Sequence, residues 1–125
     1  MPCGINAKMP AVLIVEEEPL VRMGAVNIIG DAGFAVIEAA SADEAIRILE
    51  CRGDVRVVFT DIHMPGSMDG LKLAHAVRNR WPPIKIIVTL GRELIAEQDL
   101  TEGGRFFAKP YDPVLIRNTL RAWAL

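Results

Sequence analysis

Five short apolar segments, separated by stretches with a helical spacing of apolar residues, constrain the fold of this chain more than any other feature. The first segment, Ala11-Val12-Leu13-Ile14-Val15, contains no polar residue, which is typical of a strand buried on both faces of a sheet. The other four cover residues 34–39, 55–60, 84–88 and 105–108. This alternation predicts an α/β fold, a doubly wound five-stranded parallel sheet with strand order 2-1-3-4-5.

Local signals mark the ends of the expected helices. Pro19 suits the first turn of a helix that stops at Gly33, and residues 41–44 form a capping box at the start of the next helix. Asp69 is the expected N-cap of the third helix. The stretch 91–102 is the weakest helix candidate, because it contains few large apolar residues.

Length, charge and cysteine content narrow the class of protein. The 125 residues indicate one domain, expected over residues 10–125 after a loose leader over residues 1–9. The net charge of −2 gives no basis for direct binding to nucleic acid or to an anionic membrane, and the apolar runs are too short to span a bilayer. Cys3 and Cys51 are expected to be free thiols, which favours a cytoplasmic protein.

Polar side chains follow four of the five expected strands. Glu16 and Glu17 end the first strand, Asp61 the third, Thr89 the fourth and Lys109 the fifth. Taken alone, Asp61 is either a turn cap or a site residue. Because the carboxyl ends of parallel strands meet at one edge of the sheet, these five residues are expected to converge there.

The chemistry of this set favours a cation and a phosphoryl group. Three carboxylates in close quarters repel each other unless a cation neutralises them, and an all-oxygen site suits Mg²⁺. Lys109 and Thr89 would add a positive charge and a hydroxyl donor for a tetrahedral anion, and a carboxylate such as Asp61 can act as the nucleophile. No glycine-rich phosphate loop follows any strand, which argues against a small flavodoxin-like enzyme.

Four stretches of the chain resemble the receiver domain of bacterial two-component response regulators. They are residues 12–19, residues 59–65 with 68–70, residues 86–89 and residues 106–110. The resemblance covers about residues 11–123 and implies a flavodoxin-like (βα)₅ receiver topology. It also implies phosphorelay signalling, by a phosphoacceptor that assists its own phosphorylation and dephosphorylation rather than by an enzyme in the usual sense.

The resemblance assigns a role to each residue at the strand ends. Asp61 matches the phosphoacceptor, Glu16 and Glu17 match the acidic pair of the Mg²⁺ site, and the backbone carbonyl of His63 would be a further metal ligand. The donor would be a sensor histidine kinase or a phosphotransfer protein.

The resemblance also implies a conformational switch. Thr89 matches the hydroxyl that moves toward the phosphoryl group, and Phe106 matches the rotating aromatic side chain. Lys109 matches the lysine that pairs with the oxygens of the acceptor and of the phosphoryl group.

Two residues depart from the family pattern. The second acidic residue is usually Asp, and here it is Glu17, which is longer by one methylene. The residue after the switch Thr is usually small, and here it is Leu90. These departures keep open a second hypothesis, a degenerate receiver that acts as a phosphorylation-independent protein interaction module.

A second apolar patch on the first helix indicates a partner surface. Leu20, Met23 and Val26 fall roughly opposite the face expected to pack inward, and they are the candidates for kinase docking. Scattered exposed hydrophobic residues are the alternative. We expect a stand-alone receiver that acts through protein contacts or serves as a phosphate sink. The sequence leaves open a fragment of a larger regulator, a homodimer, and the identity of the downstream partner.

Overall fold

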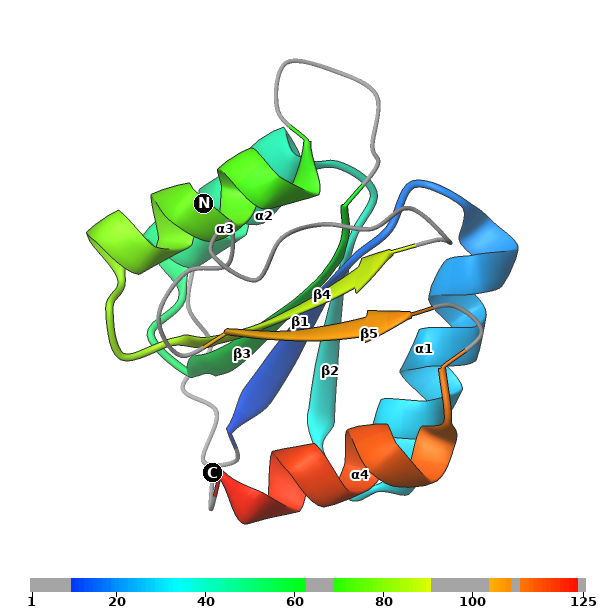
Figure 1. Cartoon of the computed structure of the whole chain (residues 1–125). Helices are drawn as coiled ribbons and strands as arrows, with labels where there is room; N and C mark the ends of the chain where they lie inside the picture. Colours follow the sequence, from blue (N-terminus) through cyan, green and yellow to red (C-terminus); the bar gives the residue numbers. More distant parts are fainter. Residues whose placement is uncertain (1–9, 63–68, 91–103, 109–110, 124–125) are drawn as a thin grey trace.

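The computed structural model of the protein describes residues 10–62, 69–90, 104–108 and 111–123. Its centre is a five-stranded parallel sheet with strand order β2-β1-β3-β4-β5 (Figure 1), which confirms the predicted topology. The strands are β1 (Ala11–Val15), β2 (Ala35–Ala39), β3 (Val55–Asp61), β4 (Lys85–Leu90) and β5 (Gly104–Ala108).

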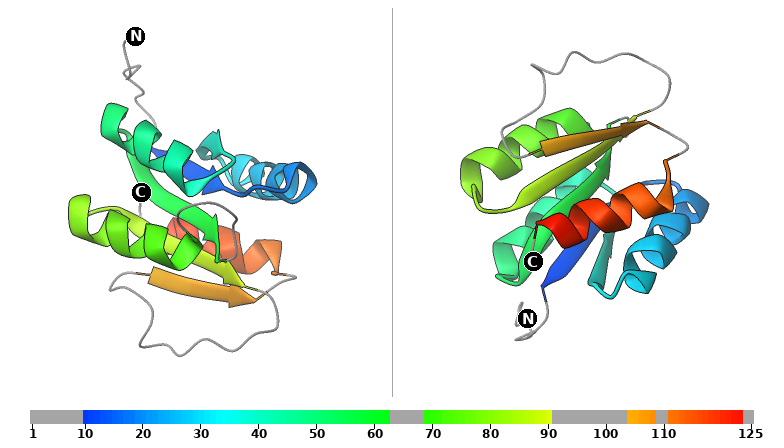
Figure 2. Two further views of the ribbon diagram at one scale, coloured as in Figure 1. Left: turned by 90° about the horizontal axis from the view of Figure 1, so that it is seen from above. Right: turned by 60° about the horizontal axis from the view of Figure 1, so that its bottom comes forward.

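Helices cover both faces of the sheet. The described helices are α1 (Pro19–Asp31), α2 (Ala42–Cys51), α3 (Gly70–Arg80) and α4 (Pro113–Ala122). In the right-hand view of Figure 2, α4 lies in front of the strands and α3 behind them. Side chains of α1 and α4 pack on one face of the sheet, and side chains of α2 and α3 pack on the other. None of the described helices is long and apolar enough to cross a membrane.

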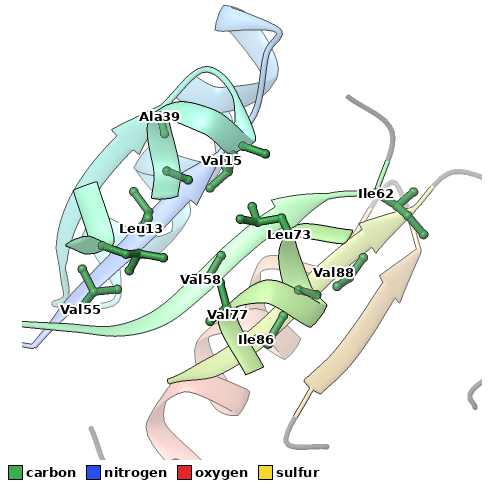
Figure 3. Close-up of a cluster of buried hydrophobic side chains, with 14 residues drawn as sticks. Leu13, Val15, Ala39, Val55, Val58, Ile62, Leu73, Val77, Ile86 and Val88 are labelled. Atoms are coloured by element: carbon green, nitrogen blue, oxygen red, sulfur yellow. The ribbon is translucent and has the colours of Figure 1, made fainter. Parts of the chain in front are cut away.

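Each face of the sheet has its own hydrophobic core. Because neighbouring residues of a strand point to opposite faces, Leu13 and Val15 pack beneath α2 and α3 (Figure 3). Val12 and Ile14 pack beneath α1 and α4. All four side chains are fully buried, which explains why β1 contains no polar residue.

The predicted helix caps are present in the structure. The Ser41 hydroxyl accepts a hydrogen bond from the Glu44 N–H at 3.1 Å, and the Asp69 carboxylate accepts one from the Lys72 N–H at 2.8 Å. Gly33 has a φ of 98°, a left-handed conformation that favours glycine directly after α1. These caps fix where the helices begin and end relative to the strands.

One expectation, for a cysteine, differs from the structure, and two others lie outside the described residues. Cys51 is disulfide-bonded, so the expectation of a free thiol is wrong for this residue. The expected leader over residues 1–9 and the expected helix over residues 91–102 lie outside the described residues.

Candidate functional site

The acidic turn after β1 is anchored by its first glutamate. The Glu16 N–H donates to the Ala39 carbonyl of β2 at 3.0 Å, and the Glu16 side chain is buried. One of its carboxylate oxygens accepts a hydrogen bond from the N–H of Glu18, the N-cap of α1, at 3.0 Å. Glu17, in contrast, is exposed. The two glutamates therefore differ in role: Glu16 shapes the turn, and Glu17 faces solvent.

Arg22 of α1 holds the same turn, and sequence reasoning missed it. Its guanidinium donates to the Glu16 carbonyl at 2.8 Å and to the Glu38 carboxylate of β2 at 3.0 Å. One planar side chain thus ties the acidic turn to the neighbouring strand. The signal in the sequence was an arginine one turn into the helix that follows the acidic run.

Asp61 ends β3 beside the end of β4. The two strands pair with Asp61 opposite Thr89, and Asp61 is half-buried. Side chains alternate along a strand, so Asp61 and Thr89 belong to the same face as Phe59 and Ile87, the face covered by α1 and α4. The structure brings the predicted acceptor and the predicted switch hydroxyl to neighbouring positions at one edge of the sheet.

Thr89 is buried and oriented toward β3. Its hydroxyl lies 3.5 Å from the Thr60 carbonyl, a long hydrogen bond, and its backbone carbonyl accepts the Ile62 N–H at 2.9 Å. The Thr60 hydroxyl donates to the Asp61 carbonyl at 3.0 Å. The backbone around Asp61 is therefore held by hydrogen bonds on both sides of the residue.

Gly70 is a further positioning residue that sequence reasoning missed. Its N–H donates to the Ile62 carbonyl at 2.9 Å. A Cβ atom at Gly70 would overlap the backbone carbonyl of Asp61 and lie 2.7 Å from the Ile62 Cα. Only glycine permits α3 to begin this close to the end of β3. The signal was the Asp69-Gly70 pair directly before a helix.

Of the remaining candidate residues, Phe106 lies on the face of the sheet opposite to Thr89. Phe106 pairs with Val88 in the sheet and packs on the cluster beneath α2 and α3. Phe106 and Thr89 therefore belong to opposite faces of the sheet. His63, Lys109 and the side chain of Leu90 lie outside the described residues.

The carboxyl edge has the ligand chemistry that Mg²⁺ requires. Within the described part of the chain, no three His, Cys, Asp or Glu side chains lie close enough to hold a metal ion together. Mg²⁺, however, needs only one or two carboxylates from a protein and keeps water as its other ligands. Asp61 with a carboxylate of the Glu16-Glu17 turn would meet that requirement.

One of the three residues expected to form a docking surface on α1 packs on the core instead. Leu20 is 75% exposed and Met23 is 58% exposed. Val26 is half-buried and packs on the cluster beneath α1 and α4. Leu20 and Met23 are therefore the accessible pair, and Val26 packs between the helix and the core of the sheet.

Comparison with known proteins places the chain in a family. Residues 12–121 match the response regulator receiver domain. The hydrogenase transcriptional regulatory protein HoxA of Cupriavidus necator is 35% identical over 123 residues, which are 94% of this chain and 24% of HoxA. The sensor kinase CckA of Brucella abortus is 44% identical over 81 residues, which are 64% of this chain and 8% of CckA.

A solved structure shows the same fold. A response regulator receiver protein from Sinorhizobium medicae superposes with a TM-score of 0.84 at 21% identity, over 92% of this chain and 94% of that chain. The fold is a doubly wound α/β domain with carboxylates at the carboxyl edge of its sheet. The chain belongs to the receiver domain family of two-component response regulators, and this membership implies phosphorelay signalling. It spans no more than about a quarter of HoxA and a smaller share of CckA.

Proposed function

We propose that Asp61 accepts a phosphoryl group from the phosphohistidine of a sensor histidine kinase or a phosphotransfer protein, in a Mg²⁺-dependent reaction. The P–N bond of the donor breaks, a P–O bond to an Asp61 carboxylate oxygen forms, and the released imidazole nitrogen takes up a proton. The bound Mg²⁺ would neutralise charge on the carboxylate and phosphoryl oxygens.

The pairing of Asp61 with Thr89 carries this proposal. The two residues are partners in neighbouring strands at the carboxyl edge of the sheet, where a small movement of Thr89 would bring its hydroxyl toward a phosphoryl group on Asp61. Lys109 follows β5 and would supply the positive charge for the phosphoryl oxygens. Thr89 would then turn from the Thr60 carbonyl toward the phosphoryl group, because its present hydrogen bond is long and weak.

The proposed response is a change in protein contacts. Movement of Thr89 would alter the packing around β4 and β5, where Phe106 lies half-buried on the opposite face. The surface around β5 and α4 would then change its affinity for a downstream partner in the cytoplasm.

Intact-mass measurement tests the phosphoacceptor directly. The full chain is incubated with acetyl phosphate with and without Mg²⁺, and a gain of one phosphoryl group is expected only with the metal. Asp61→Asn should abolish the gain. Asp112→Asn is the matched control, because Asn also caps a helix well and the cap of α4 is retained. Full phosphorylation of Asp61→Asn would contradict the assignment.

One observation favours the second hypothesis, the degenerate receiver. Glu17 stands where the family usually has Asp, and this longer side chain is exposed. Mg²⁺ tolerates changes in ligand geometry poorly. If no mass gain occurs with acetyl phosphate or with a phosphorylated kinase, the domain is a phosphorylation-independent interaction module. In Glu17→Asp, a recovered mass gain would locate the defect in the metal site.

Leu20 and Met23 are proposed to dock the phosphodonor protein. The double variant Leu20→Ser, Met23→Ser should slow transfer from a phosphorylated histidine kinase by about tenfold, because exposed apolar anchors carry much of the energy of an interface. Phosphorylation by acetyl phosphate, which needs no docking, should be unchanged. Equal slowing with both donors would indicate damage to the site instead.

A further inference from the structure

A cleft opens at the amino end of the sheet, at the other end of β3 from Asp61. Its volume is about 280 Å³. It lies between the turn that enters β3, at Gly53 and Val55, and the turn that enters β4, at residues 82–84. Because Val55 begins β3 and Asp61 ends it, this cleft is separate from the proposed phosphoacceptor site and does not depend on the function proposed there.

Three arginines line the cleft, and two of them are paired with carboxylates. Arg52 donates two hydrogen bonds to the Asp54 carboxylate, at 2.9 and 2.6 Å. The hydrogen bond from Arg52 lowers the pKa of Asp54, so this pair stays ionised at neutral pH. Arg80 forms an ion pair with Glu50 at 2.9 Å. Both pairs position guanidinium groups without leaving a net charge.

Arg56 carries the remaining charge of the cleft. It donates to the backbone carbonyls of Gly53 at 2.9 Å and of Val55 at 3.5 Å, and among the described residues it forms no ion pair with a carboxylate. Asp54, the partner of Arg52, also interacts electrostatically with Arg56, and the three guanidinium groups and two carboxylates together leave one positive charge at the cleft. The carbonyl contacts use one nitrogen of the guanidinium, and Arg56 is exposed, so its other N–H donors are not needed within the fold.

The other lining groups form flat apolar walls. The Arg80 guanidinium lies 4.4 Å from the centre of the Trp81 ring, within the range of a cation–π contact. Pro82 and Pro83 follow, and their rings restrict the backbone. The Ile84 N–H closes this turn by donating to the Trp81 carbonyl at 3.0 Å.

We propose that this cleft binds a small aromatic monocarboxylate. The carboxylate would pair with Arg56, whose planar fork matches the geometry of a carboxylate. The ring would lie against the wall formed by Trp81, Pro82 and Ile84. The cleft volume of about 280 Å³ is just below the usual range for small-molecule pockets, about 300–1,000 Å³, so the ligand is limited to one or two fused rings. A single net positive charge favours a monoanion over a nucleotide with several phosphates.

Amide chemical shifts of the ¹⁵N-labelled full chain test the proposal, with 2-naphthoate as the probe. Saturable shifts are expected at residues 52–56 and 80–84. The neutral isostere 2-naphthamide should bind about tenfold more weakly, because it lacks the charge-assisted hydrogen bond. Acetate, which has the charge and no ring, should cause no shifts there.

Two variants identify the groups involved. Arg56→Gln should weaken 2-naphthoate about tenfold and leave 2-naphthamide unchanged. Arg121→Gln, which removes an exposed charge from α4, is the control and should have no effect. Absence of shifts, shifts confined to other residues, or equal affinity for 2-naphthoate and 2-naphthamide would overturn the proposal. Shifts at the cleft with inorganic phosphate but not with 2-naphthoate would show a simple anion site and would also overturn it.

Discussion

The two edges of the sheet differ both in charge and in how their side chains are positioned. At the carboxyl edge, carboxylates gather after β1 and β3, and backbone hydrogen bonds from Ile62 and Gly70 fix the end of β3. At the amino edge, guanidinium groups gather around the turns that enter β3 and β4, and two of the three are held by carboxylates. β3 therefore carries a basic residue, Arg56, near its start and ends on an acidic residue, Asp61.

The carboxyl edge is held mainly by backbone hydrogen bonds, and the amino edge is held mainly by ion pairs. At the carboxyl edge, the hydrogen bonds that follow Asp61 involve the backbone: the Ile62 N–H donates to the Thr89 carbonyl, and the Gly70 N–H donates to the Ile62 carbonyl. An ion pair such as Arg52–Asp54 fixes a side chain by neutralising it. Four substitutions test this contrast.

The largest effect is expected at Gly70. In Gly70→Ala, the new Cβ would overlap the backbone of Asp61, so either strand or helix must move, and stability should fall by about 3 kcal/mol. Urea unfolding measures the loss. Gly24→Ala is the matched control, because a Cβ at that position would have no neighbouring atom within 4 Å and alanine favours a helix interior. A loss below about 1 kcal/mol at Gly70 would show that the close approach can relax cheaply.

Asp54→Asn tests the ion pair of the amino edge. It should reduce stability at neutral pH by about 1.5 kcal/mol, since it breaks a two-bond pair with Arg52. The hydrogen bond from Arg52 lowers the pKa of Asp54 in the folded protein. The stabilisation by this pair is therefore fully present above the pKa that Asp54 has in the unfolded chain, and it is lost as the pH falls through the lowered pKa of the folded protein. Unfolding curves of both proteins should therefore converge in acid. Asp31→Asn, at an exposed position, should show no such convergence.

Arg22→Gln tests the side-chain link of the carboxyl edge. It removes the hydrogen bonds to the Glu16 carbonyl and to Glu38, and stability should fall by about 1 kcal/mol. Phosphorylation by acetyl phosphate should slow as well, because the acidic turn loosens. Arg22→Lys keeps the charge without the planar fork and should recover only part of both losses. Unchanged rates would show that β2 and the Glu16 carboxylate alone suffice to hold the turn.

The smallest effect is expected at Arg80. Its pair with Glu50 is exposed, with side chains 49% and 46% accessible, and a double-mutant cycle with Arg80→Gln and Glu50→Gln should give a coupling below about 0.5 kcal/mol. A larger coupling, or one that does not decrease with added salt, would mean that the amino edge depends on both of its ion pairs rather than on Arg52–Asp54.

Much of the fold followed from the sequence because its signals are local. Five apolar runs predicted five strands, and Ser41, Asp69 and Gly33 predicted helix ends that the structure confirms. The inward face of α1 was less predictable, because apolar residues surround this helix. Val26 was assigned to the outer patch and packs on the core, a result that depends on the rotation of α1 against the sheet.

The candidate site was predictable to the level of strand ends. Asp61 and Thr89 were expected at one edge, and the sheet pairs them directly. Arg22 and Gly70 were not expected, because their importance comes from a carbonyl and a backbone segment that only the fold places beside them. The cleft at the amino edge could not be expected either, since it joins two turns far apart in the sequence.

The sequence by itself determined the succession of strands and helices along the chain, the helix caps, and the residues that end each strand. These features depend on neighbours within a few positions along the chain. Only the tertiary structure decided which of those residues meet. Glu16 turned its carboxylate to α1, Glu17 faces solvent, and Phe106 lies on the opposite face from Thr89. The reason is geometric: strand pairing and the alternation of side chains set both the neighbour and the face of each residue.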